Sequence, residues 1–112
     1  MDFPTQRCCF IEGARVVTPG KDLGTVAVRI EDGVIAAVGE GAHPCAGDEI
    51  VDACGLTLLP GFVDIHSHGR GGGDFCDATD AAFDTIGKGK LEDGVTSFLA
   101  TGLTRPEEEL AE

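Results

Sequence analysis

The stretch Pro60-Gly61-Phe62-Val63-Asp64-Ile65-His66-Ser67-His68-Gly69 carries the strongest structural signal in this chain. Its apolar residues predict a β-strand that ends at the histidines, where a glycine-rich segment begins. Residues two apart on a strand point to the same face, so His66 and His68 are separated by about 6.6 Å along the backbone and project together. Both rings could then bind one ion at about 2.0–2.1 Å per nitrogen. Imidazole suits Zn, Fe, Ni and Cu better than Mg or Ca.

The residues after this strand predict a β-α-β unit. We expect a glycine loop at 69–73, a helix capped by Thr79 or Asp80, a helix stop at Gly94 and a second strand at 95–100. The apolar face of the helix is expected to hold Phe83, Ile86, Lys90 and Leu91. Two strands joined in this way should be parallel, with a right-handed crossover.

The chain stops soon after this unit. Thr104 and Glu107 fit a capping box, so a second helix is expected to begin near Arg105, less than two turns before Glu112. Two parallel strands and one complete helix do not close an α/β domain, whose sheet needs helices on both faces. We therefore expect a truncated α/β domain in residues 60–112, although a naturally small α+β protein is the alternative.

Residues 1–59 predict a small all-β module. The clearest element is a hairpin in which the strands 25–30 and 34–38 flank Asp32-Gly33, a dipeptide favoured where both turn residues need positive φ. Further short strands are expected at 8–11, 14–17, 49–52 and 56–59, with a turn at Glu12-Gly13, a break at 18–20 and a loop at 39–48. No catalytic cluster precedes Pro60, so an independent β domain without an active site is an alternative for this part.

Composition limits the partners of the chain. Its 112 residues include 8 Lys and Arg against 20 Asp and Glu, a net charge of −12, which disfavours nucleic acid and anionic membranes. No basic segment followed by a long apolar run is present at the start, so no secretory signal or membrane span is predicted. The five cysteines include no C-x-x-C pair, and reduced thiols in a cytoplasmic protein are expected.

Two histidines alone do not make a catalytic metal site. Such a site typically has three protein ligands and a water molecule, and the chain offers no convincing third ligand, because His43 lies in a loop of the β module and is expected at the surface. Without further context, His66 and His68 could also be ordinary strand-end histidines.

The context resembles a known family. Asp52-Ala53-Cys54-Gly55 and the stretch 59–69 resemble the opening of metal-dependent amidohydrolases, in which a small β-sandwich precedes a (β/α)8 barrel and His-x-His ends the first barrel strand. The segments 69–75 and 94–104 resemble more narrowly the N-acetylglucosamine-6-phosphate deacetylase family. Ala100 departs from that pattern, since the family often has proline there.

The resemblance implies a function for the complete protein. It implies that His66 and His68 are ligands of a divalent metal, Zn or Fe, and that the substrate is an amino-sugar phosphate, hydrolysed to glucosamine 6-phosphate and acetate. It places the catalytic Asp, the remaining ligands and the phosphate-binding residues beyond residue 112, and it implies a homodimer. Two alternatives stay open: a dihydroorotase- or hydantoinase-like enzyme, and a non-catalytic β-rich metal-binding module.

Overall fold

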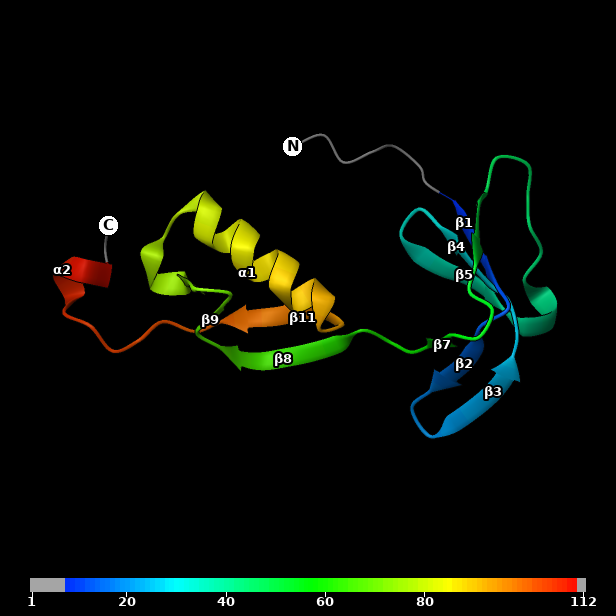
Figure 1. Ribbon diagram of the computed structural model, residues 1–112, viewed down its shortest axis with the longest axis horizontal. Helices are drawn as coiled ribbons and strands as arrows, with labels where there is room; N and C mark the ends of the chain where they lie inside the picture. Colours follow the sequence, from blue (N-terminus) through cyan, green and yellow to red (C-terminus); the bar gives the residue numbers. More distant parts are fainter. Residues whose placement is uncertain (1–7, 111–112) are drawn as a thin grey trace. The chain divides into compact units, whose positions relative to one another are not determined.

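The computed structural model describes residues 8–110, and for 109 and 110 only the backbone. The chain divides into two compact units, one up to Pro60 and one from Gly61 (Figure 1). The first unit consists of strands and one short 3-10 helix at Gly39–Gly41, and the second combines strands and helices, so the chain has the mixed α/β, strand-rich character that was predicted. No helix in the described part of the chain is long and apolar enough to cross a membrane.

The larger sheet of the first unit has the strand order β5-β4-β1-β6. Its strands are β1 (Cys9–Glu12), β4 (Val28–Glu31), β5 (Val34–Val38) and β6 (Glu49–Asp52). β1 pairs antiparallel with β4 and parallel with β6. The predicted hairpin between β4 and β5 is confirmed, and both Asp32 (φ 51°) and Gly33 (φ 77°) have the positive φ that its turn requires.

A second sheet of the first unit has the order β3-β2-β7, with β2 at Arg15–Thr18, β3 at Lys21–Thr25 and β7 at Thr57–Leu58. The predicted break at residues 18–20 is the turn between the antiparallel strands β2 and β3, but residues 21–24 of β3 were not predicted as a strand. The predicted strand 25–30 is divided between sheets, because Thr25 ends β3 and Val28 begins β4. Across the Glu12-Gly13 turn the chain likewise passes from one sheet to the other rather than closing a hairpin.

The core of the first unit is small and is built from both sheets. Its buried apolar residues are Phe10, Ala14, Val16, Val28, Ala42 and Ala53. The return strand of the hairpin contributes little to it, since Val34 and Ile35 are exposed. His43 is exposed, as predicted, and all five cysteines are free.

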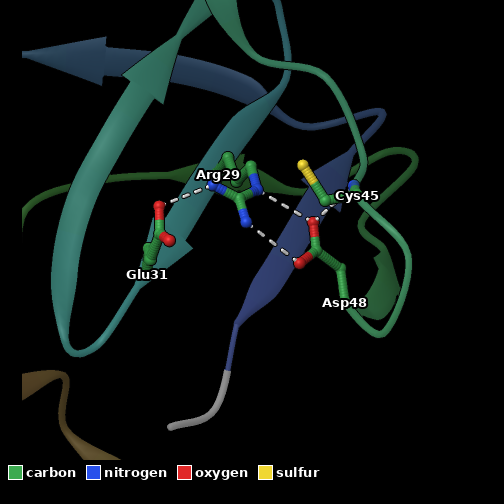
Figure 2. A network of polar contacts seen from close by, with 4 residues as sticks. All are labelled: Arg29, Glu31, Cys45 and Asp48. Atoms are coloured by element: carbon green, nitrogen blue, oxygen red, sulfur yellow. Dashed lines mark hydrogen bonds and ion pairs between the residues drawn. The ribbon is translucent and has the colours of Figure 1, made fainter.

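An ion-pair network fixes the loop between β5 and β6 (Figure 2). The Arg29 guanidinium donates from Nε to Asp48 Oδ2 at 2.9 Å and from Nη1 to Glu31 Oε2 at 2.8 Å, and the Cys45 backbone N–H also donates to Asp48. The Asp48 side chain is only 2% exposed, so this carboxylate depends on its partners for solvation. The hydrogen bond from Arg29 accordingly holds the pKa of Asp48 below its ordinary value.

The second unit contains the predicted β-α-β arrangement. β8 (Phe62–Ser67) and β11 (Val95–Ala100) are parallel neighbours, joined through helix α1 (Asp80–Glu92) (Figure 1). Thr79 caps the helix by accepting the Ala82 N–H at 3.2 Å, and Gly94 (φ 78°) follows its end, as expected.

The buried face of α1 differs from the predicted one. Ala82, Ile86 and Lys90 are buried, whereas Phe83 is 46% exposed and Leu91 is 65% exposed. The buried positions lie four residues apart, so they form one narrow stripe along the helix. Phe83 still contacts the buried ring of Phe75 at a centroid distance of 5.5 Å.

Two other expectations for the second unit were wrong in detail. Residues 69–73 form a hairpin of β9 (Gly69–Arg70) and β10 (Gly73–Asp74) rather than an open loop. The last helix, α2 (Glu107–Leu110), begins at Glu107 instead of near Arg105, so Thr104 is too far from its first turn to cap it.

Candidate metal site

The two histidines lie at the end of β8, beside an irregularity in the sheet. Asp64 pairs with Phe98 and Ser67 pairs with Ala100, so β8 has one more residue than β11 in this interval. Ile65 and His66 therefore form a bulge in the strand. A bulge changes the direction of the side chains next to it, and bulges are frequent beside active sites.

The predicted convergence of the two rings is present. His66 Nε2 lies 3.1 Å from His68 Nε2, and the ring centroids are 4.9 Å apart with an interplanar angle of 74°. At this distance one Nε2–H donates to the other Nε2. His66 is exposed and His68 is half-buried.

The pair fits a shared metal ion. Two nitrogens bound at about 2.0–2.1 Å to one tetrahedral ion are about 3.4 Å apart, which is close to the separation of 3.1 Å observed here. The buried Nδ1 of His68 has no hydrogen-bond partner among the described residues. A metal-binding histidine ordinarily donates from its second nitrogen, so the contacts of this ring are incomplete within residues 8–108.

Hydrogen bonds to Thr101, the residue that follows β11, hold the end of β8 in place. The Ser67 N–H donates to Thr101 Oγ1 at 3.3 Å, and the Thr101 N–H donates to the Ser67 carbonyl at 2.8 Å. Ser67 itself is 4% exposed. Because Ser67 lies between the two histidines, these bonds fix the backbone that carries both rings.

The β9–β10 hairpin fixes His68 from the other side. The Phe75 N–H donates to the His68 carbonyl at 3.0 Å. Gly69 approaches β10 so closely that a Cβ atom there would lie 2.0 Å from the Gly73 carbonyl oxygen. The glycine that follows His68 is thus required by a backbone contact as well as by chain flexibility.

Asp64 and Lys90 support the site and were not among the predicted site residues. Asp64 Oδ2 accepts from Lys90 Nζ at 2.5 Å, and Asp64 Oδ1 accepts the His66 backbone N–H at 3.1 Å. The Lys90 hydrogen bond, followed by the one from His66, lowers the pKa of Asp64 below its ordinary value. A lysine on the apolar face of a predicted helix and an aspartate within an apolar strand were the signals that could have identified the pair.

No third ligand joins the two histidines within the described residues, which contain no group of three His, Cys, Asp or Glu side chains able to hold a metal. A shallow pocket of about 300 Å³ lies between the Gly71–Gly73 turn and the start of α1, but neither histidine lines it. What the described residues supply is a pair of converging histidines at one strand end.

Comparison with known proteins places this arrangement in context. No family model matches the chain. The chain is 38% identical over 78 residues to N-acetylglucosamine-6-phosphate deacetylase of Lysinibacillus sphaericus, covering 70% of the chain and 20% of the relative. It is 36% identical over 96 residues to the protein of the same name from Bacillus subtilis (strain 168), covering 85% and 24%. A dihydroorotase of Trichlorobacter lovleyi is 38% identical over 61 residues, which are 54% of the chain and 14% of that protein.

Solved structures give the same result. N-acetylglucosamine-6-phosphate deacetylase from Pasteurella multocida superposes with a TM-score of 0.80 at 25% identity, covering 93% of the chain and 28% of that structure. The enzyme of this name from Mycobacterium smegmatis gives a TM-score of 0.70 at 33% identity, covering 90% and 28%. The chain spans about a fifth to a quarter of the length of the curated relatives named above. By sequence and by fold, the chain is related to hydrolases of the amidohydrolase superfamily, and within it resembles the N-acetylglucosamine-6-phosphate deacetylases.

Proposed function

We propose that His66 and His68 are two ligands of a catalytic divalent metal ion, Zn or Fe, in an enzyme that hydrolyses the acetamide of N-acetylglucosamine 6-phosphate. The products are glucosamine 6-phosphate and acetate. The observation that carries this proposal is the 3.1 Å separation of the two Nε2 atoms at the end of β8. The similarity to deacetylases in both sequence and structure supports the choice of substrate.

The chemistry that the reaction needs matches what these residues can hold. An amide resists attack by neutral water, and a divalent ion, when bound, polarises the carbonyl and makes water a better nucleophile at neutral pH. The residues of this chain would bind and orient the ion. Each ring must present an unprotonated Nε2 to it, so the two metal–nitrogen bonds would take the place of the hydrogen bond between the rings. The hydrogen bonds at the end of β8 hold the backbone that places the two nitrogens at a spacing that suits one ion.

The remaining chemistry lies outside the described residues. The leaving amine must receive a proton from a general acid, and the resemblance assigns this role to an Asp beyond residue 112. We propose accordingly that residues 60–112 are the start of a (β/α)8 barrel preceded by a β-sandwich part at 1–59, and that the complete enzyme is a cytoplasmic homodimer. Residues 1–112 alone should release no acetate from the substrate, and measurable release would contradict this assignment.

The substrate is tested by assaying the complete protein. We expect acetate release from N-acetylglucosamine 6-phosphate, lost on chelation and restored by added Zn²⁺ or Fe²⁺. His66→Ala should lower the metal content and reduce kcat/KM at least about a hundredfold. Loss of a ligand should cost more than loss of a residue that only hydrogen-bonds to a ligand, which typically costs about ten- to a hundredfold. His43→Ala is the matched control, because His43 is exposed and lies in the other unit. A His66→Ala variant with unchanged metal content would refute the ligand role.

A second candidate is a cyclic amide hydrolase. The similarity to dihydroorotases and a TM-score of 0.59 at 25% identity to a D-hydantoinase support it. Activity of the same preparation on dihydroorotate or a hydantoin, with none on the sugar phosphate, would favour this candidate. If neither class of substrate is turned over but metal is still bound at His66 and His68, the non-catalytic metal-binding module is favoured.

A further inference from the structure

The direction of the His66 ring depends on a backbone that the sheet itself does not hold. Ile65 and His66 have no register partner in β11, because the bulge places them between the pairs Asp64–Phe98 and Ser67–Ala100. The extra residue of a bulge is left out of the ladder, so its N–H needs another acceptor. Asp64 Oδ1 provides it by accepting the His66 N–H at 3.1 Å.

The carboxylate that accepts this bond is itself fixed by helix α1. Its other oxygen accepts from Lys90 Nζ at 2.5 Å. The Lys90 side chain is only 11% exposed, and an ammonium so shielded from water must keep its counter-ion. Lys90 follows Ile86, which is fully buried, by one turn of the helix, so the ammonium extends from a well-packed element.

A second ion pair among the described residues of this unit provides a contrast. Arg70 and Asp93 are 2.6 Å apart and also connect the hairpin side of the site to the end of α1. Their side chains are 47% and 49% exposed, and pairs of this kind contribute little. Of these two ion pairs, only Lys90–Asp64 also forms a hydrogen bond with the backbone of a histidine.

We propose that Asp64, held by Lys90, is a positioning residue that sets the direction of the His66 ring and thereby its convergence with His68. The proposal rests on the proposed function in so far as the rings converge on a metal ion. Its distinctive claim is that Asp64 acts through the His66 N–H, so loss of Asp64 disturbs ligand geometry rather than only the packing of α1 on β8.

The test uses the complete protein and measures the Kd for Zn²⁺ by competition with a chelator. Asp64→Ala is expected to raise the Kd about ten- to a hundredfold, the range for residues that orient a metal ligand. Lys90→Met leaves the Asp64 carboxylate in place without its counter-ion and should raise the Kd less. Asp93→Asn is the matched control, since it removes the exposed ion pair, and should leave the Kd unchanged.

A second measurement needs no metal. In the metal-free protein the His66 amide hydrogen should exchange faster in Asp64→Ala than in the wild type, and at the wild-type rate in Asp93→Asn. Unchanged exchange at His66, or an unchanged Kd in a folded Asp64→Ala variant, would overturn the proposal. If Asp64→Ala does not fold, Lys90→Met is used instead, and an unchanged Kd there would overturn it as well.

The proposed function and the positioning role of Asp64 can fail separately. If His66→Ala binds Zn²⁺ as tightly as the wild type, the proposed function is wrong, while His66 amide exchange still decides the positioning role. If His66→Ala loses the ion but Asp64→Ala keeps it with wild-type affinity, the proposed function stands and the positioning role is refuted.

Discussion

The two units of the chain hold their strands in different ways. In the first unit the central strand β1 has neighbours on both sides, and a shielded ion-pair network around Arg29 and Asp48 fixes the adjacent loop. Among the described residues of the second unit, β8 pairs only with β11, and Val63, Ile65 and Leu99 on these strands are 66%, 73% and 61% exposed. Parallel strands are usually covered on both faces, so within residues 61–110 the strand with the histidines has few contacts.

This difference indicates where the second unit is sensitive to single substitutions. Its support comes from helix α1, from the close approach of β9 to β10 and from the Lys90–Asp64 ion pair. We therefore expect single substitutions at these contacts to disturb the candidate site, whereas the first unit should distribute similar losses over two sheets.

The largest effect is expected at Ile86, which is fully buried on the inner face of α1. Ile86→Ala should lower the free energy of unfolding by about 2–5 kcal/mol, because it removes buried methyl groups and leaves a cavity. Leu91→Ala in the same helix is the matched control; its side chain is 65% exposed, and the change should stay within about 0.5 kcal/mol. Urea unfolding followed by circular dichroism measures both, and equal losses would show that α1 is not packed as described.

A smaller and more local effect is expected at Gly69. A Cβ atom in Gly69→Ala would lie 2.0 Å from the Gly73 carbonyl oxygen, so β9 and β10 must separate. Overpacking of this kind costs about 1–3 kcal/mol, and the separation should also displace the His68 carbonyl from the Phe75 N–H. Gly72→Ala is the control, because a Cβ atom at Gly72 would meet nothing within 4 Å. Any effect of this variant would come from backbone strain and not from a steric contact. Chemical shifts of His68 should change in the first variant much more than in the second.

The smallest effect tests the first unit and depends on pH. The Arg29 hydrogen bond lowers the pKa of Asp48, so the carboxylate stabilises the fold fully above the pKa of the unfolded chain and loses this contribution as pH falls through the folded value. The urea midpoint of the wild type should therefore fall on acidification below about pH 4. Asp48→Asn should have a lower midpoint at neutral pH and a flatter acid dependence, with the exposed Glu40→Gln as control. An identical pH dependence in Asp48→Asn and wild type would show that the Arg29–Asp48 ion pair does not stabilise the first unit.

Much of the second unit could be predicted because its signals are local. The apolar run before His66, the cap at Thr79 and the stop at Gly94 predicted β8 and α1, and β11 matches the predicted strand. The parallel pairing followed from the connection through a helix. The hairpin at 69–74 was missed, since two-residue strands of mostly glycine have no hydrophobic period to detect.

The first unit was predicted less well because its pairing is not local. β3 has the sequence Lys21-Asp22-Leu23-Gly24-Thr25, which has one apolar residue and no alternation. The separation of β1 and β2 into different sheets depends on β6 and β7, more than thirty residues later in the chain. Such choices are made by tertiary packing rather than by strand propensity.

At the candidate site, the spacing of His66 and His68 predicted their convergence, but not how it is achieved. Strand alternation alone would suffice in a regular strand, whereas β8 contains a bulge between Asp64 and Ser67. The contact of Asp64 with Lys90 joins residues 26 positions apart, so no local pattern could have paired them.

Both proposals depend on the His66 and His68 rings binding one ion together. Crystals of the complete protein grown with Zn²⁺ would test it most directly, through anomalous diffraction measured on either side of the zinc absorption edge. We predict a single anomalous peak about 2.0–2.1 Å from both Nε2 atoms. Absence of a peak there, or a zinc ion bound to only one of the two rings, would contradict a metal ion shared by His66 and His68.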